Sequence, residues 1–378
     1  MTTVVEINDL KELARRRVPK MFFEYADSGS WTESTYRANE ADFNKVYLRQ
    51  RVAVNMSDRS LAGSMVGQDV SMPIALAPTG LCGMQHADGE ILAAQAAEDF
   101  GVPFTLSTMS ICSLEAVAAA TRTPFWFQLY VMRDRGFVGE LIDRAKAVGC
   151  SALMLTLDLQ ILGQRHNDIR NGLGSFGPKQ ILQLISRPRW CLGMAKSQHK
   201  GFGNIQGHVN GVADNNSLSE WVAGQFDPDL SWDDIAWIKE RWGGPLILKG
   251  VLDTDDAKRC VDVGGDALVV SNHGGRQLDG ARSSIRVLPE IVEAVGDDIE
   301  VQFDGGIRSG QDALKAMCLG AKGTYIGRPF LYGLGAMGKE GVTKTLDILR
   351  AEMDTTMALC GERQLSSMGP HNLDGIEF

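Results

Sequence analysis

From residue 74 onward the chain repeats one pattern of apolar and polar positions eight times. Each unit opens with a short, branched apolar run, as expected for a strand buried on both faces, and most units close on polar or glycine residues. We predict strands at residues 74–79, 103–107, 125–130, 152–158, 245–250, 267–272, 300–305 and 323–327. Helical patterns separate most of these strands, at residues 90–100, 136–148, 254–263 and 311–319.

Glycine often closes a predicted helix just before the next strand, as at Gly101, Gly149, Gly264 and Gly320. Strand and helix alternating in this way indicate a parallel α/β fold. Eight units favour a closed (β/α)8 TIM barrel over an open sheet. The pattern of apolar and polar positions in residues 6–17 predicts an amphipathic helix before the barrel. Residues 20–29 follow with aromatic side chains and then a turn signal. We expect a single barrel domain over residues 1–378 with an N-terminal helical extension.

Composition narrows the possible functions. The formal net charge of -9 excludes general nucleic-acid binding, because no overall basic field attracts phosphates. The seven cysteines are scattered, with no CxxC pair, which predicts reduced thiols and no metal site. We find neither a signal-peptide pattern nor an apolar run of about 18 residues, so we expect a cytoplasmic protein that does not span a membrane.

Polar residues close most of the predicted strands. In a barrel the carboxyl ends of the strands form one rim, where active sites lie. His273 can move a proton near neutral pH, and Arg276, three residues later, can hold a carboxylate through its two-pronged guanidinium. The residues expected together on this rim are Gln128, Thr156, Lys249, His273 and Asp304.

Two glycine-rich turns follow the last two strands, at residues 304–310 and 326–330. Their backbone amides, a helix start, Arg308 and Arg328 predict a phosphate site where barrels commonly hold one. A flat heterocycle attached to that phosphate would then lie across the barrel mouth, beside Lys249. A cation at this place suits the anionic reduced form of a flavin, but a Schiff-base lysine of an aldolase is an alternative.

The motifs resemble those of the FMN-dependent α-hydroxy-acid oxidising family, which includes glycolate oxidases, mandelate dehydrogenases, flavocytochrome lactate dehydrogenases and bacterial L-lactate dehydrogenases. The most specific motifs are SNHGGRQLDG and DGGIRSG. Others are PKMFFEYADSG, APTGLCGMQH, WFQLYVMRDRGF, LTLDLQILGQRHNDIRNG and LILKGVLDTDDA. The resemblance covers essentially the whole chain and is strongest to the bacterial L-lactate dehydrogenases, through WFQLYVMRDRGF, RPRWCLG and FDPDLSWDDIAWIK.

This resemblance implies a role for each matching residue. His273 would be the base, Asp158 would pair with it, and Tyr130 would contact the substrate hydroxyl. The substrate carboxylate would be held by Arg276, Arg165 and Tyr25, although pattern alone assigns Tyr25 to packing. FMN would be bound by Thr79, Gly80, Ser107, Gln128, Thr156, Lys249, Ser271, Asp304, Gly305, Gly306, Arg308, Gly327 and Arg328. Whether hydrogen leaves the substrate as hydride or as a proton stays open.

Three positions depart from the family pattern. Gln160 stands where many members have proline, which changes the stiffness of the loop. Met109 stands where glycolate oxidases have tryptophan, so the size of the substrate is less defined. Gly80 replaces an alanine, and we expect it to leave more room beside the flavin and substrate.

Residues 171–230 are too long for an ordinary connection between strands four and five. Within residues 179–200 basic and apolar residues alternate without an acidic residue, against the negative charge of the whole chain. This pattern is typical of a segment at the inner face of a membrane, and it also fits an active-site lid or a subunit contact.

The sequence therefore predicts FMN-dependent oxidation of an L-2-hydroxy acid, with L-lactate to pyruvate as the first choice. Mandelate- or glycolate-type oxidation, a Schiff-base aldolase and a non-catalytic membrane-surface protein are the alternatives. Electrons would leave to oxygen, a quinone or another carrier. The family resemblance also implies a homotetramer or a larger ring.

Overall fold

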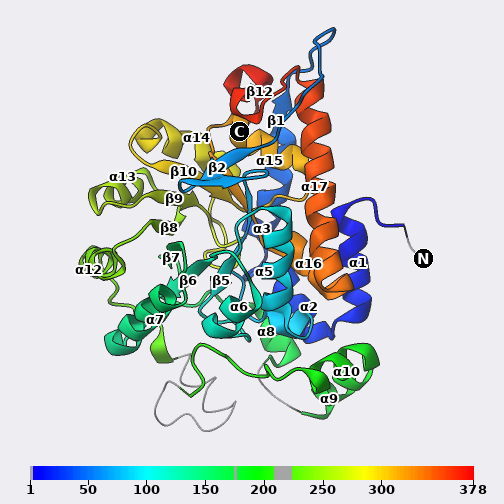
Figure 1. Ribbon diagram of the computed structural model, residues 1–378, viewed down its shortest axis with the longest axis vertical. Helices are drawn as coiled ribbons and strands as arrows, with labels where there is room; N and C mark the ends of the chain where they lie inside the picture. The colour runs from blue at the N-terminus through cyan, green and yellow to red at the C-terminus, as the bar shows by residue number, and fades with distance from the viewer. Residues whose placement is uncertain (1–2, 174–176, 208–223) are drawn as a thin grey trace.

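The structure, a computed structural model, describes residues 3–173, 177–207 and 224–378. An eight-stranded parallel sheet runs in the order β4-β11-β10-β9-β8-β7-β6-β5 (Figure 1). The sheet closes on itself because Leu76 of β4 bridges to Phe104, beside β5, and donates its amide to the Pro103 carbonyl. The strands are β4 (Ile74–Leu76), β5 (Thr105–Ser107), β6 (Trp126–Tyr130), β7 (Ala152–Thr156), β8 (Leu246–Val251), β9 (Ala267–Val270), β10 (Glu300–Asp304) and β11 (Gly323–Ile326). The predicted (β/α)8 barrel is confirmed.

The strands read as continuous apolar runs because both of their faces are buried. In β7, Ala152 and Met154 point into the barrel, where they pack with Trp126 and Tyr325. Leu153 and Leu155 belong instead to the larger core under the surrounding helices. Those helices are α5 (Gly89–Phe100), α6 (Leu114–Ala120), α7 (Arg135–Ala147), α12 (Trp232–Trp242), α13 (Thr254–Asp262), α14 (Ser284–Val295), α15 (Gly310–Cys318) and α16 (Arg328–Met337).

A hairpin of β2 (Gly63–Met65) and β3 (Gln68–Val70) closes the amino-terminal end of the barrel. Met65 is fully buried there against Gly323, which leaves it room by having no side chain. The Glu300 carboxylate accepts a hydrogen bond from the Val66 amide, and this bond fixes the hairpin to β10. Since this end is filled, a ligand has to enter at the opposite rim, where the polar strand ends lie.

The N-terminal extension consists of α1 (Ile7–Arg17), α2 (Lys20–Asp27), α3 (Ser34–Ala41) and η1 (Asp42–Lys45). The sequence predicted α1, whereas the aromatic segment that follows it forms a second helix, α2. The chain ends in α17 (Lys339–Leu359), η2 (Leu365–Ser367), η3 (Pro370–Asn372) and β12 (Leu373–Ile376), and β12 pairs with β1 (Val46–Leu48). Figure 1 shows α1 alongside α16 and α17, so both ends of the chain pack together.

The long connection between β7 and β8 contains further helices, namely α8 (His166–Asn171), α9 (Pro178–Ile185) and α10 (Pro188–Lys196). Proline at the first position of α9 and of α10 suits a helix start, because its missing amide has no helical partner there. Residues 174–176 and 208–223 of this connection lie outside the described residues. No helix of the described part is both long and apolar enough to cross a bilayer.

Candidate active site

A cavity of about 660 Å³ opens at the carboxyl ends of the strands. Most of the residues predicted for the site line it: Tyr25, Thr79, Gly80, Met109, Tyr130, Thr156, Arg165, Lys249, His273, Arg276, Asp304, Gly305, Gly306, Arg308, Gly327 and Arg328. The other predicted residues, Ser107, Gln128, Asp158 and Ser271, lie behind this lining and hydrogen-bond to it or to each other. The structure therefore brings the predicted set into one place.

His273 lies on a tightly bent loop after β9. It has φ +59°, and Gly274 and Gly275 follow with φ +66° and +71°. A non-glycine residue in this region is strained, and such strain persists only where the surroundings enforce it. A Cβ on Gly275 would lie 2.5 Å from the Tyr36 amide of α3, and Ser30 donates its own amide to the Gly275 carbonyl. The N-terminal extension thus holds the loop that presents His273.

His273 is hydrogen-bonded through Nδ1 to Oδ1 of Asp158 at 2.9 Å, which leaves Nε2 for a ligand. Burial lowers the pKa of His273 below its usual 6.5, and the Asp158 carboxylate only partly opposes this. Burial alone would raise the pKa of Asp158, but the imidazole and Lys249 reverse the effect and lower it. The pair is therefore a neutral imidazole beside an ionised carboxylate, which is the arrangement of a general base.

Two residues behind Asp158 were not predicted for the site. A Cβ on Gly250, which has φ +104°, would lie 2.6 Å from Cγ of Asp158, so only glycine allows this approach. Gln277 donates to the carbonyls of Asp158 and Ile161 at 2.7 and 2.8 Å. Gln277 thereby ties the loop after β7 to the loop of His273. Both residues lie within motifs that carry the resemblance, but pattern alone gives them no role.

An arginine cluster faces the base. The guanidinium of Arg276 stacks 4.7 Å from the ring centroid of Tyr25 and donates to the carbonyls of Tyr25 and Ser28. Burial and the neighbouring Arg165 lower the pKa of Arg276 to about 9, so it remains charged at neutral pH. Nε of Arg165 is buried without a hydrogen-bond partner in the described protein. These two cations suit a carboxylate ligand.

Asp168, which the sequence pattern did not single out, also lines this cavity. Its Oδ1 atom is buried and lacks a hydrogen-bond partner in the described part of the chain. Burial raises the pKa of Asp168, while the charges of Arg276 and Arg165 partly lower it again. Asp168 lies in the first turn of α8, three residues after Arg165, which is the N-cap of that helix, and this proximity in the chain could have pointed to it.

Tyr130 and Phe226 form another wall of the cavity. Their rings meet edge to face with centroids 5.9 Å apart. Phe226 is held by a β-bridge to Met132 and by the ion pair between Arg135 and the adjacent Asp227 at 2.7 Å. No periodic signal pointed to Phe226, because it lies within the long connection between β7 and β8. Burial raises the pKa of Tyr130, which keeps its hydroxyl protonated.

Gly80 does not leave open space. A Cβ there would lie 3.1 Å from Cβ of Met109 and 3.2 Å from the Tyr25 hydroxyl. The room expected from glycine at this position is therefore taken up by Met109 and Tyr25. The consequence is a closer approach of α2 to the loop after β5.

A chain of polar groups crosses the floor of the cavity. Ser107 donates to Gln128 at 3.1 Å, and Gln128 donates to Thr156 at 3.0 Å. On the other side, Lys249 forms an ion pair with Asp304 at 2.7 Å and donates to Ser271 at 2.9 Å. Each of these groups is buried, so their mutual bonds hold the hydrogen-bonding surface in place.

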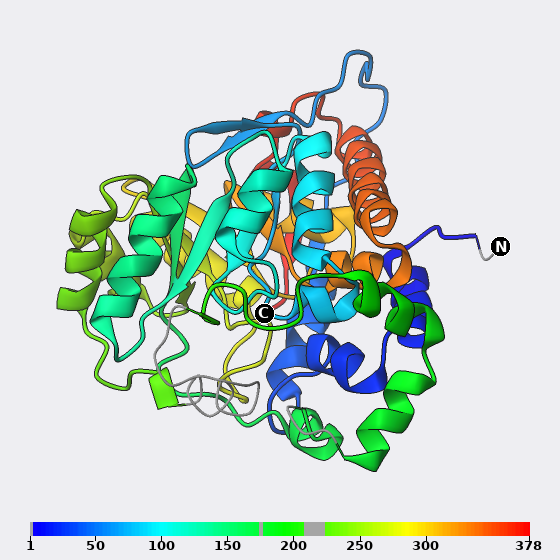
Figure 2. The ribbon, with the colours of Figure 1, turned by 60° about the horizontal axis from the view of Figure 1, so that its bottom comes forward.

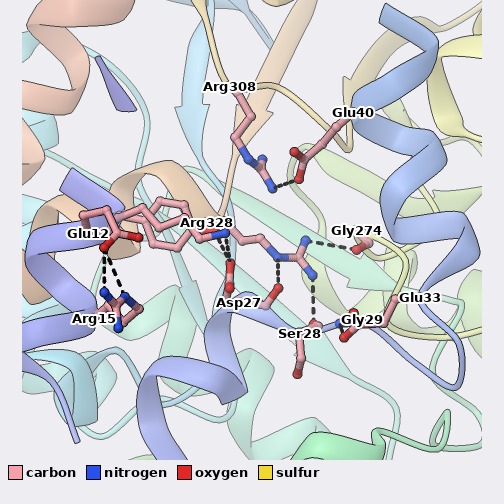
Figure 3. A network of polar contacts seen from close by, with 12 residues as sticks. Glu12, Arg15, Asp27, Ser28, Gly29, Glu33, Glu40, Gly274, Arg308 and Arg328 are labelled. Atoms are coloured by element: carbon pink, nitrogen blue, oxygen red, sulfur yellow. Dashed lines mark hydrogen bonds and ion pairs between the residues drawn. The ribbon is translucent and has the colours of Figure 1, made fainter. Parts of the chain in front are cut away.

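Two arginines flank the glycine turns after β10 and β11 (Figure 3). Arg308 pairs with Glu40 of α3 at 2.7 Å. Arg328 donates to the carbonyls of Gly274, Ser28 and Asp27 at 2.9, 2.9 and 3.1 Å. Three of the five guanidinium N–H groups of Arg328 are thus engaged, and two are left for an anion.

The lining fits FMN. Helix α16 begins at this rim with Gly327 as its N-cap and without a side-chain cap, so its first amides can bind a phosphate. The polar floor from Thr156 to Lys249 offers donors and one cation to the edge of a flavin ring. The volume of the cavity is in the usual range for a cofactor together with a small ligand.

Known proteins match this chain over nearly its full length. It is 45% identical over 371 residues to an L-lactate dehydrogenase of Haemophilus influenzae (strain PittEE), with 97% of each chain covered. It is also 45% identical over 376 residues to an L-lactate dehydrogenase of Azorhizobium caulinodans, with 98% of each covered.

Solved structures also match this chain over nearly its full length. The monotopic membrane protein (S)-mandelate dehydrogenase superposes with a TM-score of 0.94 at 33% identity, covering 99% of this chain and 100% of that one. A mandelate oxidase variant with (S)-mandelic acid superposes with a TM-score of 0.84 at 33% identity, covering 100% of each chain. Residues 14–375 match the family described as FMN-dependent dehydrogenase, and the chain belongs to that family.

Proposed function

We propose that this protein oxidises an L-2-hydroxy acid, with L-lactate to pyruvate as the first choice. The observation that carries the proposal is the pairing of His273 with Asp158 beside Arg276 and Arg165 in one cavity. A base facing a carboxylate anchor suits removal of hydrogen from the carbon next to a carboxylate. The names of the relatives support L-lactate as the substrate.

Each side chain then has a defined task. His273 takes a proton through Nε2, and Asp158 stabilises the imidazolium that results. Arg276, Arg165 and Tyr25 hold and orient the substrate carboxylate. Tyr130, kept protonated by burial, hydrogen-bonds the substrate hydroxyl. Gly80 and Met109 shape the space for the substrate side chain.

The residues that would hold FMN are those on the floor and the phosphate end of the cavity. When bound, FMN supplies the acceptor for the two electrons that leave the substrate. Arg308, Arg328 and Gly327 would bind its phosphate. The ring and ribityl chain would be held by Thr79, Gly80, Ser107, Gln128, Thr156, Lys249, Ser271, Asp304, Gly305 and Gly306.

The test is an anaerobic mixture of the purified holoprotein with L-lactate, followed by visible absorbance. We expect the yellow colour to bleach, and its rate of return in air separates an oxidase from a dehydrogenase. Bleaching with mandelate but not with L-lactate would instead favour the mandelate-type alternative, which the mandelate enzymes among the structural neighbours support. A colourless protein that does not take up FMN would overturn the proposal.

Lys249 also bears on the aldolase alternative. Its ammonium group is buried and paired with Asp304 and Ser271, whereas a Schiff-base lysine needs a free neutral amine. The pairing therefore supports the role of Lys249 beside FMN. Trapping with borohydride in the presence of a carbonyl substrate would reveal a Schiff base if one formed.

We further propose peripheral contact of residues 179–200 with the cytoplasmic membrane face. Ile181, Leu182, Ile185 and Leu192 are exposed there, with Leu182 70% exposed, and Arg189 and Lys196 lie among them. A structural neighbour is described as a monotopic membrane protein, which supports this contact. We expect L182S/I185S to release the protein from anionic lipid vesicles in sedimentation, while L359S, an exposed control on α17, leaves binding unchanged.

A homotetramer or larger ring is the assembly we propose from the family resemblance. Light scattering of the purified protein in mild detergent measures its mass directly. A monomer under these conditions would contradict the assembly without touching the proposed reaction.

A further inference from the structure

An aspartate, a cysteine and a histidine from three separate segments of the chain meet beside the start of α5. Asp88 comes directly before α5, Cys112 lies in the loop after β5, and His199 follows α10. Each residue offers one atom that can bind a metal ion, and these atoms lie within 4.8 Å of one another. The sequence predicted no metal site, because ligands so far apart in the chain form no local motif. None of the three lines the active-site cavity.

The carboxylate of Asp88 does not cap its own helix. An aspartate at this position usually accepts hydrogen bonds from the first amides of the helix, but Asp88 precedes α5 without such a bond. Its Oδ1 atom instead lies 2.8 Å from Nδ1 of His199 and accepts a hydrogen bond from the Ser197 hydroxyl at 2.6 Å. The side chains of Asp88 and His199 are 40% and 30% exposed, so water and ions can reach them.

Cys112 adds a sulfur ligand, and a second carboxylate lies behind it. Cys112 is fully buried, and the buried Glu90 carboxylate accepts the amides of Gly83, Ile111 and Cys112 at 3.1, 2.9 and 3.4 Å. Glu90 has no ion-pair partner in the part of the chain that the structure describes. Glu90 and Asp88 both place negative charge near the thiol, which favours a cation at this place.

The ligand types indicate which cation. Sulfur and imidazole nitrogen suit Zn²⁺, whereas Mg²⁺ and Ca²⁺ take oxygen ligands. Three protein ligands and one water complete the tetrahedral shell that zinc adopts. Bonds from zinc to these ligands are about 2.0–2.3 Å long, so the three atoms have to approach one another slightly. The partly exposed side chains of Asp88 and His199 have room for that adjustment.

We infer that Asp88, Cys112 and His199 form a binding site for Zn²⁺. On binding, a Zn–S bond replaces the S–H bond of Cys112, and the proton passes to the solvent. The thiolate and the Asp88 carboxylate together balance the two positive charges of the ion. The site does not depend on the proposed reaction.

Zinc at this site joins the long connection to the barrel. Figure 2 shows the segment after α10, in green, running across the cyan part of the barrel, where His199 contacts Asp88. Residues 200–202, which come directly after His199, line the active-site cavity. At their other end, the Gly203 amide donates to the Ser110 carbonyl at 3.1 Å. The ion therefore fixes the second end of a short stretch of the cavity wall.

The first test measures zinc binding to the purified holoprotein by equilibrium dialysis after treatment with EDTA. We expect one ion per chain, and C112S and H199N should each weaken its binding at least about tenfold. C260S and H371N are the matched controls and should bind zinc as the wild type does. Cys260 on α13 is as fully buried as Cys112, and His371 in η3 bonds to Glu362 instead. FMN content reports whether each variant is folded.

Two further measurements identify the ligands and the effect of the ion. Co²⁺ in place of Zn²⁺ should give tetrahedral visible bands at longer wavelengths than those of oxidised FMN, and C112S should remove them. Zn²⁺ should slow amide hydrogen exchange in residues 197–202 of the wild type but not of H199N.

The proposal is overturned if the wild type binds no zinc, or if C112S and H199N bind it with unchanged affinity. Because H199N changes a partly exposed side chain, it decides the matter even if C112S does not fold. An ion that binds without slowing exchange in residues 197–202 would overturn the joining of the long connection to the barrel.

Discussion

The Nδ1 atom of His273 lies 2.9 Å from Oδ1 of Asp158, and the two residues are 115 positions apart in the chain. The pair joins the loop after β7 to the loop after β9. Burial favours the neutral imidazole, while the carboxylate provides the charge that would stabilise it once protonated. The geometry thus keeps the base unprotonated before reaction and supports it afterwards.

The pH dependence of turnover follows from this pair. Burial lowers the pKa of His273, so the imidazole first becomes protonated at a pH below its usual pKa of 6.5. The acid limb of kcat/KM should therefore have its midpoint below pH 6.5. D158N removes the carboxylate that raises the pKa of His273, so the limb should move to still lower pH. Turnover should fall at least about tenfold because the ring loses its orientation. A limb that moves upward in D158N, measured in steady-state pH profiles, would contradict this assignment.

Gly250 should be required for activity more than for folding. G250A places a Cβ 2.6 Å from Cγ of Asp158 at φ +104°, whereas G264A adds one at φ +74° with only Lys239 at 4.0 Å. Both variants should lose roughly 1–2 kcal/mol or more of unfolding free energy from backbone strain. Only G250A should also lose at least tenfold in kcat, measured with FMN content matched. Equal activity of the two variants would mean that the position of Asp158 tolerates displacement.

Asp168 should compete with the substrate for the arginines. It is protonated below its raised pKa and anionic above it, so KM for the hydroxy acid should rise as pH increases through that pKa. D168N should have a lower KM at high pH, by up to about tenfold or 1.4 kcal/mol, and should lose this dependence. D255N, at an exposed position on α13, is the control. KM values measured from pH 5 to 9 decide the matter, and parallel curves for D168N and wild type would rule out the competition.

Phe226 should limit the size of the substrate side chain. F226A removes the ring that packs edge to face on Tyr130 and enlarges the cavity there. The ratio of kcat/KM for mandelate to that for L-lactate should rise at least tenfold, within the range expected for a change in an apolar pocket. F100A removes a ring that stacks on Arg350 elsewhere and should leave the ratio unchanged. If both variants change the ratio alike, Phe226 does not contact the substrate.

The sequence predicted the barrel because successive side chains of each buried strand point alternately into two apolar cores. Each strand is therefore an unbroken apolar run in the sequence. Lys249, His273 and Asp304 could be assigned to one rim since strand ends share an edge. Tyr25 could not be placed from its pattern, because α2 reaches the site only by lying across the barrel mouth. Asp168 and Phe226 were missed because their importance depends on contacts with Arg276 and Tyr130, which no local periodicity encodes.

The docking of α1 and α2 has a consequence for the order in which the protein matures. Helix α1 packs on α16 and α17, and Arg328 at the start of α16 donates to the carbonyls of Ser28 and Gly274, so both the N-terminal segment and the loop of His273 are held by parts of the chain that are translated late. During synthesis, α1 and α2 therefore lack their packing partners until the rest of the barrel has been translated. The loop of His273 therefore gains its final support only when the C-terminal helices have emerged. A nascent chain that stops short of them would have a nearly complete barrel but an unassembled catalytic centre.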